Sequence, residues 1–111
     1  MPFAAGCGSD AKVKTDDLVR QAQDAAAAGE LQKAIDLLTQ ALDERPSFYA
    51  YNERARIRLE QGDEAGALAD CQAGLQLDPE NSDLIWLQAE LQKAPGDRFS
   101  GDAAEPPSAN K

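Results

Sequence analysis

The chain has 111 residues, a formal net charge of −9 at pH 7 and no histidine. This length allows one small domain, and the acidic balance excludes nucleic acid as a partner, because binding the phosphate backbone needs clustered lysine and arginine. Without histidine the commonest general base and metal ligand are missing and no catalytic constellation replaces it, so the sequence predicts no enzyme, no metal and no cofactor.

Residues 1–14 are small and polar and lack helical periodicity, which predicts a flexible segment. Within it, two alanines and Gly6 precede Cys7. This run resembles the end of a bacterial lipoprotein signal, in which the cysteine after small residues carries lipid, although the charged and long apolar parts of such a signal are absent. Cys7 is therefore a lipidation candidate, and residues 8–14 would then be a polar tether at a bacterial membrane or periplasm. A chance run of small residues before a cysteine is the alternative, which leaves a cytoplasmic protein.

Residues 15–94 are rich in helix formers with helical periodicity and predict five helices. Thr15, followed by two aspartates, predicts the capped start of the first helix, and Gly29 ends it. The expected ranges of the other four helices are 31–43, 48–61, 64–77 and 82–94, with Ser82 as the last cap. Because the connections are short and no alternating β-branched run appears, we expect an all-α fold of antiparallel hairpins.

Residues 95–111 hold three of the six prolines and two glycines. Such a stretch buries too little apolar surface to offset the entropy lost on ordering. We expect a disordered tail.

The two predicted hairpins match at an offset of 33 residues. The matched pairs are Leu18 and Tyr51, Ala22 and Ala55, Ala34 and Ala67, Leu38 and Cys71, Ala41 and Gly74, and Pro46 and Pro79. The fifth helix continues this register one residue later, with Ile85 and Ala89. A period of this length with two helices per unit resembles the tetratricopeptide repeat family.

The resemblance implies a short α-solenoid with units at 15–47 and 48–81 and a C-terminal capping helix at 82–94. Small residues let the paired helices approach closely, and Gly74 allows still closer packing at a cost of about 1 kcal/mol in helix propensity. Cys71 falls in a core position and predicts a buried, inert thiol. Leu84, Leu87 and Leu91 are expected to pack back on the fourth helix.

The resemblance further implies a concave groove, lined by the first helix of each unit, that binds a peptide or helix. The expected partner-binding residues are Val19, Gln23, Tyr49, Asn52, Arg56, Trp86 and Glu90. Trp86 is open to a second interpretation, as a packing residue of the cap. Arg54, Arg56 and Arg58 form the only basic cluster, which would either read an acidic peptide or pair with nearby Glu53, Glu60 and Asp63.

The predicted function is a protein-binding adaptor or assembly factor. Self-association that completes the short solenoid is the alternative, and a non-catalytic subunit beside an enzyme is a third reading. The expected partners are thus another protein or a second copy, and a membrane only through lipid on Cys7. The high content of alanine, glycine and aspartate leans toward a bacterial source.

Overall fold

A computed structural model describes residues 8–99 and 106–107. Within these ranges all regular structure is helical, which confirms the all-α prediction. The elements are α1 (Gly8–Ala27), α2 (Leu31–Glu44), α3 (Phe48–Glu60), α4 (Glu64–Leu77), α5 (Ser82–Leu91) and the 3-10 turn η1 (Pro95–Asp97). The bounds of α2, α3 and α4 agree with the predicted ranges to within one residue.

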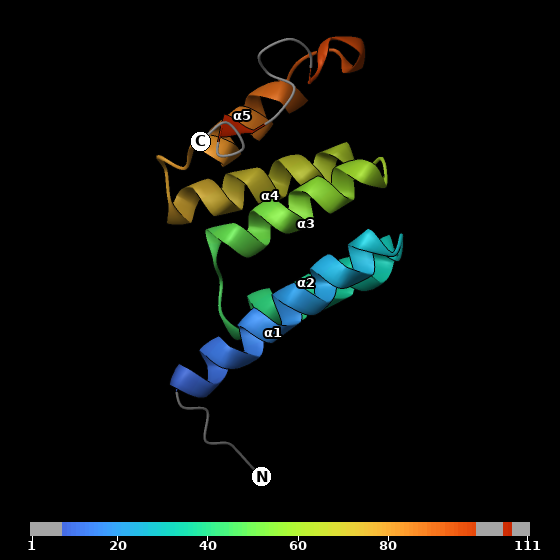
Figure 1. The fold of residues 1–111 in the computed structure, drawn as a ribbon. Coiled ribbons are helices and arrows are strands. Elements are labelled where there is room, and N and C mark those ends of the chain that lie inside the picture. The colour runs from blue at the N-terminus through green and yellow to red at the C-terminus, as the bar shows by residue number, and fades with distance from the viewer. Residues whose placement is uncertain (1–7, 100–105, 108–111) are drawn as a thin grey trace.

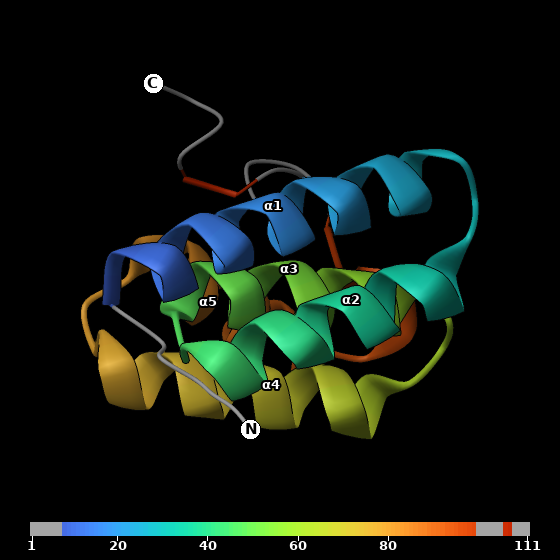
Figure 2. The same ribbon diagram turned by 90° about the horizontal axis from the view of Figure 1, so that it is seen from below.

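The helices pack as sequential neighbours. α1 packs against α2, and α3 packs against α4. The contact between α2 and α3 joins these two hairpins, and α5 packs on α4 (Figure 1). Viewed from below, α1 and α2 run side by side at one end of the stack (Figure 2). This is the arrangement of a short helical-repeat solenoid.

Glycines and side-chain caps set the helix ends. Gly29 and Gly62 follow α1 and α3 with φ angles of 84° and 86°, a left-handed backbone that suits glycine. The Ser47 hydroxyl accepts a 3.0 Å hydrogen bond at the start of α3, from the backbone N–H of Ala50. For α5 the predicted cap Ser82 is wrong by one residue: Ser82 is the first helical residue, and Asn81 Oδ1 accepts from Leu84 N–H at 3.0 Å.

The predicted start of α1 is also wrong. The helix begins at Gly8 rather than at Thr15, so residues 8–14, expected to be a flexible segment, are helical. Thr15 lies within the helix and is 7% exposed, which leaves no role for it as a cap. Lys14 Nζ lies 3.1 Å from Glu44 Oε2 at the end of α2, but both side chains are well exposed, so this ion pair contributes little to the extension.

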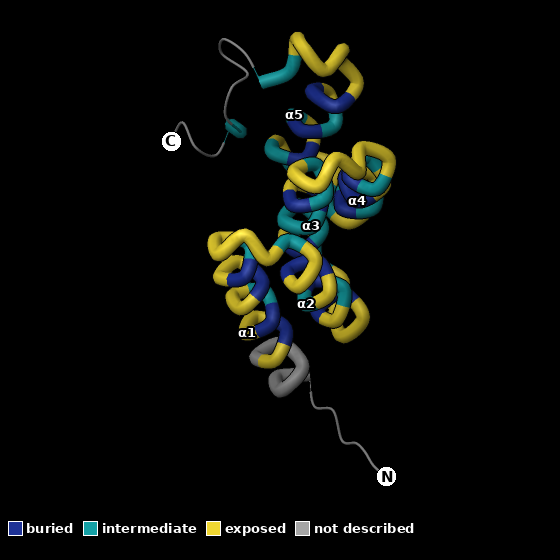
Figure 3. The backbone as a smooth tube through the Cα atoms, turned by 90° about the vertical axis from the view of Figure 1, so that its right-hand side faces the viewer, coloured by how far each residue is buried: buried dark blue, intermediate teal, exposed yellow. Residues whose placement is uncertain are grey.

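Most of the buried apolar side chains fall into two clusters. Figure 3 colours the backbone of the buried residues dark blue. The first lies between α1, α2 and α3 and contains Ala22, Ala25, Ala34, Ile35, Leu38, Leu42, Ala50 and Ile57. The second lies between α3, α4 and α5 and contains Ala55, Ala67, Cys71, Leu84, Leu87 and Leu91. The predicted packing of the cap on α4 is confirmed.

Small residues permit close helix packing. Ala22, Ala34, Ala55 and Ala67 are all 0% exposed. A Cβ atom at Gly74 would lie 2.7 Å from Leu84 Cδ1 and 3.3 Å from Tyr51 Cβ. The absence of a side chain at Gly74 therefore lets α3 and α5 approach α4 closely, as predicted.

Two features of α5 depart from the repeat pattern. Ile85 is 47% exposed, whereas its counterpart Leu18 is 8% exposed, because the described chain supplies no second helix to cover α5. Beyond α5, residues 95–99 were expected to be disordered, yet Phe99 packs against the second cluster. The remaining predicted tail residues, apart from 106 and 107, lie outside the described part of the chain.

Among the described helices, none combines the length and the apolar character that crossing a bilayer requires.

Candidate functional site

A pocket of about 540 Å³ opens between α1 and α3, beside the turn that connects α2 to α3. Val19 and Gln23 reach it from α1, and Phe48 and Tyr49 from the first turn of α3. Leu77, at the end of α4, contributes another apolar side chain. The Ser47 cap and Pro46 fix the start of α3 here, so the two aromatic residues stand at the pocket by virtue of the local helix geometry.

Exposed apolar side chains concentrate around this pocket. Phe48, Tyr49 and Leu77 are 40%, 47% and 50% exposed and are three of the four large hydrophobic residues on the described surface. Gln23 Nε2 donates a 2.6 Å hydrogen bond to the Tyr49 hydroxyl oxygen, which holds the ring in place across the gap between α1 and α3. The pocket thus presents a positioned aromatic ring within an apolar surface, the composition of binding hot spots.

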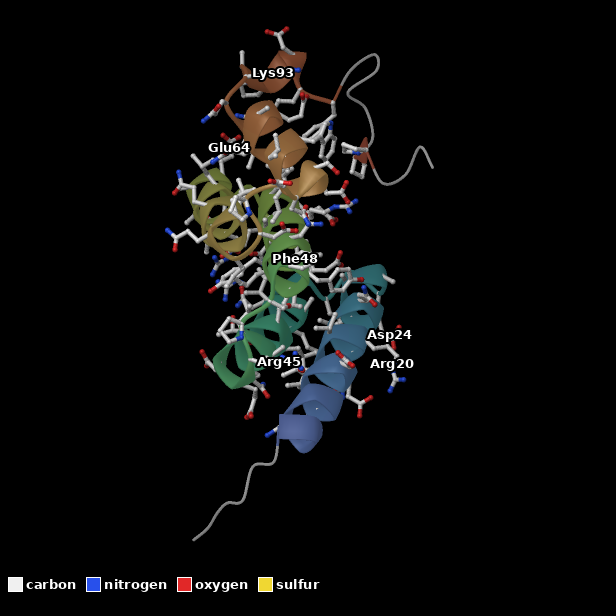
Figure 4. All side chains as sticks on the ribbon, turned by 90° about the vertical axis from the view of Figure 1, so that its left-hand side faces the viewer. Arg20, Asp24, Arg45, Phe48, Glu64 and Lys93 are labelled. Carbon is white, nitrogen blue, oxygen red and sulfur yellow. The ribbon has the colours of Figure 1, made fainter. Side chains whose placement is uncertain are left out.

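The pocket carries basic side chains although the chain is acidic. Arg20 and Arg45 both line it, together with Asp16. Arg20 Nη2 lies 2.8 Å from Asp17 Oδ1, and both side chains are well exposed, so the pair is weak. Figure 4 locates Arg20 on α1, Arg45 at the end of α2 and Phe48 at the start of α3. A carboxylate near the apolar surface would therefore find guanidinium donors.

The structure brings together three of the predicted partner-binding residues, since Val19, Gln23 and Tyr49 all line the pocket. Asn52 and Arg56 do not line it. They follow Tyr49 along α3 at spacings that place all three on one helix face, with Arg56 exposed and Asn52 half-buried. These two residues extend the candidate surface along α3.

Trp86 and Glu90 lie apart from the pocket and contact the C-terminal segment. The Trp86 and Phe99 ring centroids are 5.4 Å apart with an interplanar angle of 52°. Glu90 is 3% exposed, accepts from Lys93 Nζ at 2.6 Å and from the Phe99 backbone N–H at 2.7 Å. The hydrogen bond from Lys93, then the one from Phe99, holds the pKa of Glu90 below its usual range. Glu90, expected on the groove surface, is thus buried beneath the chain's own residues.

Two of the three clustered arginines, Arg54 and Arg58, form ion pairs between α3 and α4. Arg54 Nε and Nη2 donate to Asp70 Oδ2 and Oδ1 at 3.0 and 2.7 Å, and Arg58 Nη1 donates to Asp70 Oδ2 at 3.0 Å. The hydrogen bond to Asp70, opposed by burial, raises the pKa of Arg54. Of the predicted partners only Asp63 is used, 3.9 Å from Arg58. Arg56 has no ion pair among the residues with described side chains and stays exposed.

Sequence reasoning missed Phe48, Leu77 and Arg45 at the pocket and Asp70 in the core. Phe48 and Leu77 occupy the ends of helices, where helical periodicity assigns no face. The signal for Asp70 was its place one residue before Cys71 and three residues after Ala67, both of which the repeat register matches to apolar positions. An acidic residue there needs a cation on the facing helix, and Arg54 and Arg58 lie one turn apart on α3.

The structure describes one of the two cysteines. Cys71 is buried as predicted, and burial raises the pKa of its thiol to about 12, with the Asp70 charge adding to the effect. Cys7 and the rest of the proposed lipoprotein signal lie outside the described residues. Among the described side chains, no group of three acidic or cysteine residues could hold a metal ion.

No family model matches the chain. Sperm-associated antigen 1 of Mus musculus, a protein that contains tetratricopeptide repeats, is 32% identical to it over 66 residues. The aligned stretch covers 60% of this chain but 7% of that protein, so the chain spans a small part of this relative. Nothing in this similarity supports a bacterial source or a lipoprotein. The similarity and the helical fold together favour a non-enzymatic protein-interaction module of the helical-repeat kind.

Proposed function

We propose that this chain is an adaptor or assembly factor that binds a peptide segment of a partner protein in the pocket between α1 and α3. The observation that carries the proposal is the concentration of three exposed large apolar side chains, Phe48, Tyr49 and Leu77, around one pocket. Contiguous exposed apolar surface on a small protein commonly marks an interaction site.

The chemistry of the pocket indicates what kind of segment fits. An aliphatic or aromatic side chain would pack on Tyr49, whose ring is already held by Gln23. Because the ring is held before binding, little conformational freedom is lost when the ligand arrives. A carboxylate beside that side chain would pair with Arg45 or Arg20. The expected ligand is therefore an apolar residue flanked by an acidic one.

Peptide selection on the full chain tests the proposal. Random peptides displayed on phage would be selected against the immobilised protein, and the affinities of synthetic copies measured by calorimetry. We expect apolar residues with neighbouring Asp or Glu among the selected peptides. Tyr49→Ala should weaken their binding at least about tenfold, the effect of losing one hot-spot side chain.

The matched control is Ile85→Ser, because Ile85 has the same 47% exposure as Tyr49 but lies on α5, outside the pocket. Peptides that bind through the pocket should bind this variant as they bind the wild type. If both substitutions weaken binding equally, or if neither does, the ligand does not occupy this pocket.

Self-association is the second candidate, favoured by the exposed face of α5. Ile85 and Ala89 are exposed, whereas Leu18, the counterpart of Ile85, and Ala22 and Ala55, the counterparts of Ala89, are buried in the two hairpins. A second copy that covered this face would complete the solenoid. Sedimentation velocity over a wide concentration range tests it: a dimer that Ile85→Ser abolishes supports self-association, and a monomer at every concentration rules it out.

A further inference from the structure

Arg98 and Phe99 lie against α5 and the start of α4 in the manner of a bound peptide. The Phe99 ring packs against Trp86 at a centroid distance of 5.4 Å, and its backbone N–H donates to Glu90 at 2.7 Å. The neighbouring Arg98 donates from Nη1 and Nη2 to the two Glu64 carboxylate oxygens at 2.8 and 3.1 Å. An aromatic side chain, a backbone donor and a guanidinium are thus each held by a matching group.

The same arginine also completes the end of α5. Arg98 Nη2 donates to the Leu91 carbonyl at 2.9 Å, and its Nε donates to the Lys93 carbonyl at 3.0 Å. Carbonyls at a helix C-terminus lack partners within the helix, and a cation is favourable there. Figure 4 shows Glu64 at the start of α4 and Lys93 just beyond α5. The arginine therefore joins two helix ends that the repeat itself leaves unlinked.

The backbone of Phe99 depends on these contacts. Its φ angle is 55°, and it is the only non-glycine residue with a positive φ among those described. Bulky residues rarely adopt this conformation unless the surroundings hold it. Once the Trp86 and Glu90 contacts were lost, Phe99 would leave this conformation.

The repeat register shows that a different path was available to the chain. Gly96 lies 34 residues after Gly62, which in turn lies 33 residues after Gly29, and an acidic residue follows each. Gly29 and Gly62 have positive φ angles and lead into α2 and α4. Gly96 has no positive φ, and η1 turns the chain back onto α5 instead. A 3-10 turn followed by Arg98 and Phe99 thus lies where a repeat would continue with a helix.

We propose that Arg98 and Phe99 are an internal ligand, and that Trp86, Glu90 and Glu64 form a second peptide site whose external ligand carries a basic residue followed by an aromatic one. The inference rests on the proposed function as a peptide-binding module, but it concerns a different site. Glu90 is already paired with Lys93 at 2.6 Å, so the Glu64 carboxylate is the group that favours a cationic ligand. A tethered ligand competes with a free one at a local concentration in the millimolar range, so the site is closed until the segment is displaced.

Fluorescence of Trp86, the single tryptophan of the chain, tests the proposal on the full-length protein. The variant R98A/F99A removes the internal ligand. The probe is a capped synthetic peptide that copies residues 93–99, titrated to millimolar concentration. We expect the variant's tryptophan emission to shift from that of the wild type, and the peptide to restore it. The peptide should bind the variant at least about tenfold more tightly than the wild type, as removal of a competing internal ligand requires.

The control peptide replaces the phenylalanine by alanine and should not restore the emission. Equal binding to wild type and variant, binding that ignores this change, or an emission spectrum that the substitutions leave unaltered would each overturn the proposal. If R98A/F99A fails to fold by circular dichroism, Phe99→Ala alone provides a milder release, because it removes the ring contact with Trp86 and leaves the Arg98 pair with Glu64 in place. Tyr49→Ala should not alter this peptide's binding, which separates the outcome from that of the α1 and α3 pocket.

Discussion

Arg54 donates two hydrogen bonds to the carboxylate of Asp70, at 2.7 and 3.0 Å, across the contact between α3 and α4. The Asp70 side chain is 3% exposed and that of Arg54 is 13% exposed. Arg54 Nη1 also donates to the Thr39 hydroxyl of α2 at 3.0 Å, so one guanidinium joins three helices. Removing one partner of a buried ion pair costs more free energy than replacing both partners by apolar residues, because the remaining charge is left unpaired.

Asp70→Asn should lower the free energy of unfolding by about 2 kcal/mol, because two partly buried guanidiniums lose their counter-charge. Urea denaturation followed by circular dichroism measures the change. Asp24→Asn is the matched control on an exposed surface of α1, where we expect an effect within about 0.5 kcal/mol. Equal stability of the two variants would contradict the assigned role of Asp70.

The C-terminal segment should detach on acidification. The pKa of Glu64 is lowered by its hydrogen bond from Arg98, and that of Glu90 by those from Lys93 and Phe99. A folded-state pKa below the unfolded value of 4.5 adds stability that is present above about pH 4.5 and is lost as the pH falls through the lowered value. Trp86 emission should therefore be constant from neutral pH to about 4.5 and change below it. A Phe99→Ala variant should lack this step, and a step that persists in it would point to another cause.

The Cys71 thiol should be unreactive in the folded protein. Burial raises its pKa to about 12, so the thiolate is scarce at any pH at which the protein is handled. In a Cys7→Ser variant, which leaves one thiol, we expect an aromatic disulfide reagent to react at least about 100-fold more slowly than in denaturant. Rapid labelling without denaturant would show that α4 opens locally.

Gly74→Ala should destabilise the protein by about 1 kcal/mol, because overpacking costs about 1–3 kcal/mol and helix propensity returns about 1 kcal/mol. The added Cβ would meet Leu84 Cδ1 at 2.7 Å. A double-mutant cycle with Leu84→Val checks this mechanism, since valine lacks the atoms that collide. The penalty should vanish or reverse in that background, and an unchanged penalty would assign it to Tyr51 instead.

Helix periodicity predicted the middle of the fold well. The repeat register and the resemblance that it carries predicted a core position for Cys71, which is buried together with the register positions Ala22, Leu38 and Ala55. Gly29 was predicted to end the first helix, and its positive φ angle agrees with that role. These features follow from local rules of helix geometry, which the order of residues carries directly.

The ends of the described chain and much of the site were not predictable in this way. α1 begins at Gly8, before the capping pattern at Thr15, and the order of Phe99 depends on Trp86 and Glu90. Such contacts join residues far apart in sequence and leave no periodic trace. The pocket shares this property, because Phe48 and Leu77 become neighbours only when α3 and α4 pack.

The two core clusters share one helix, α3. α3 contributes Ala50 and Ile57 to the first cluster and Ala55 to the second, and it is the only described helix with side chains in both. Cooperativity between the two ends of the molecule must therefore pass through this helix: α1 and α2 can fray while α3, α4 and α5 stay packed, whereas loss of α3 would open both clusters. A ligand at Tyr49 would bind the first turn of this shared helix. Its binding energy would tie the unfolding of α1 and α2 to that of α3, α4 and α5.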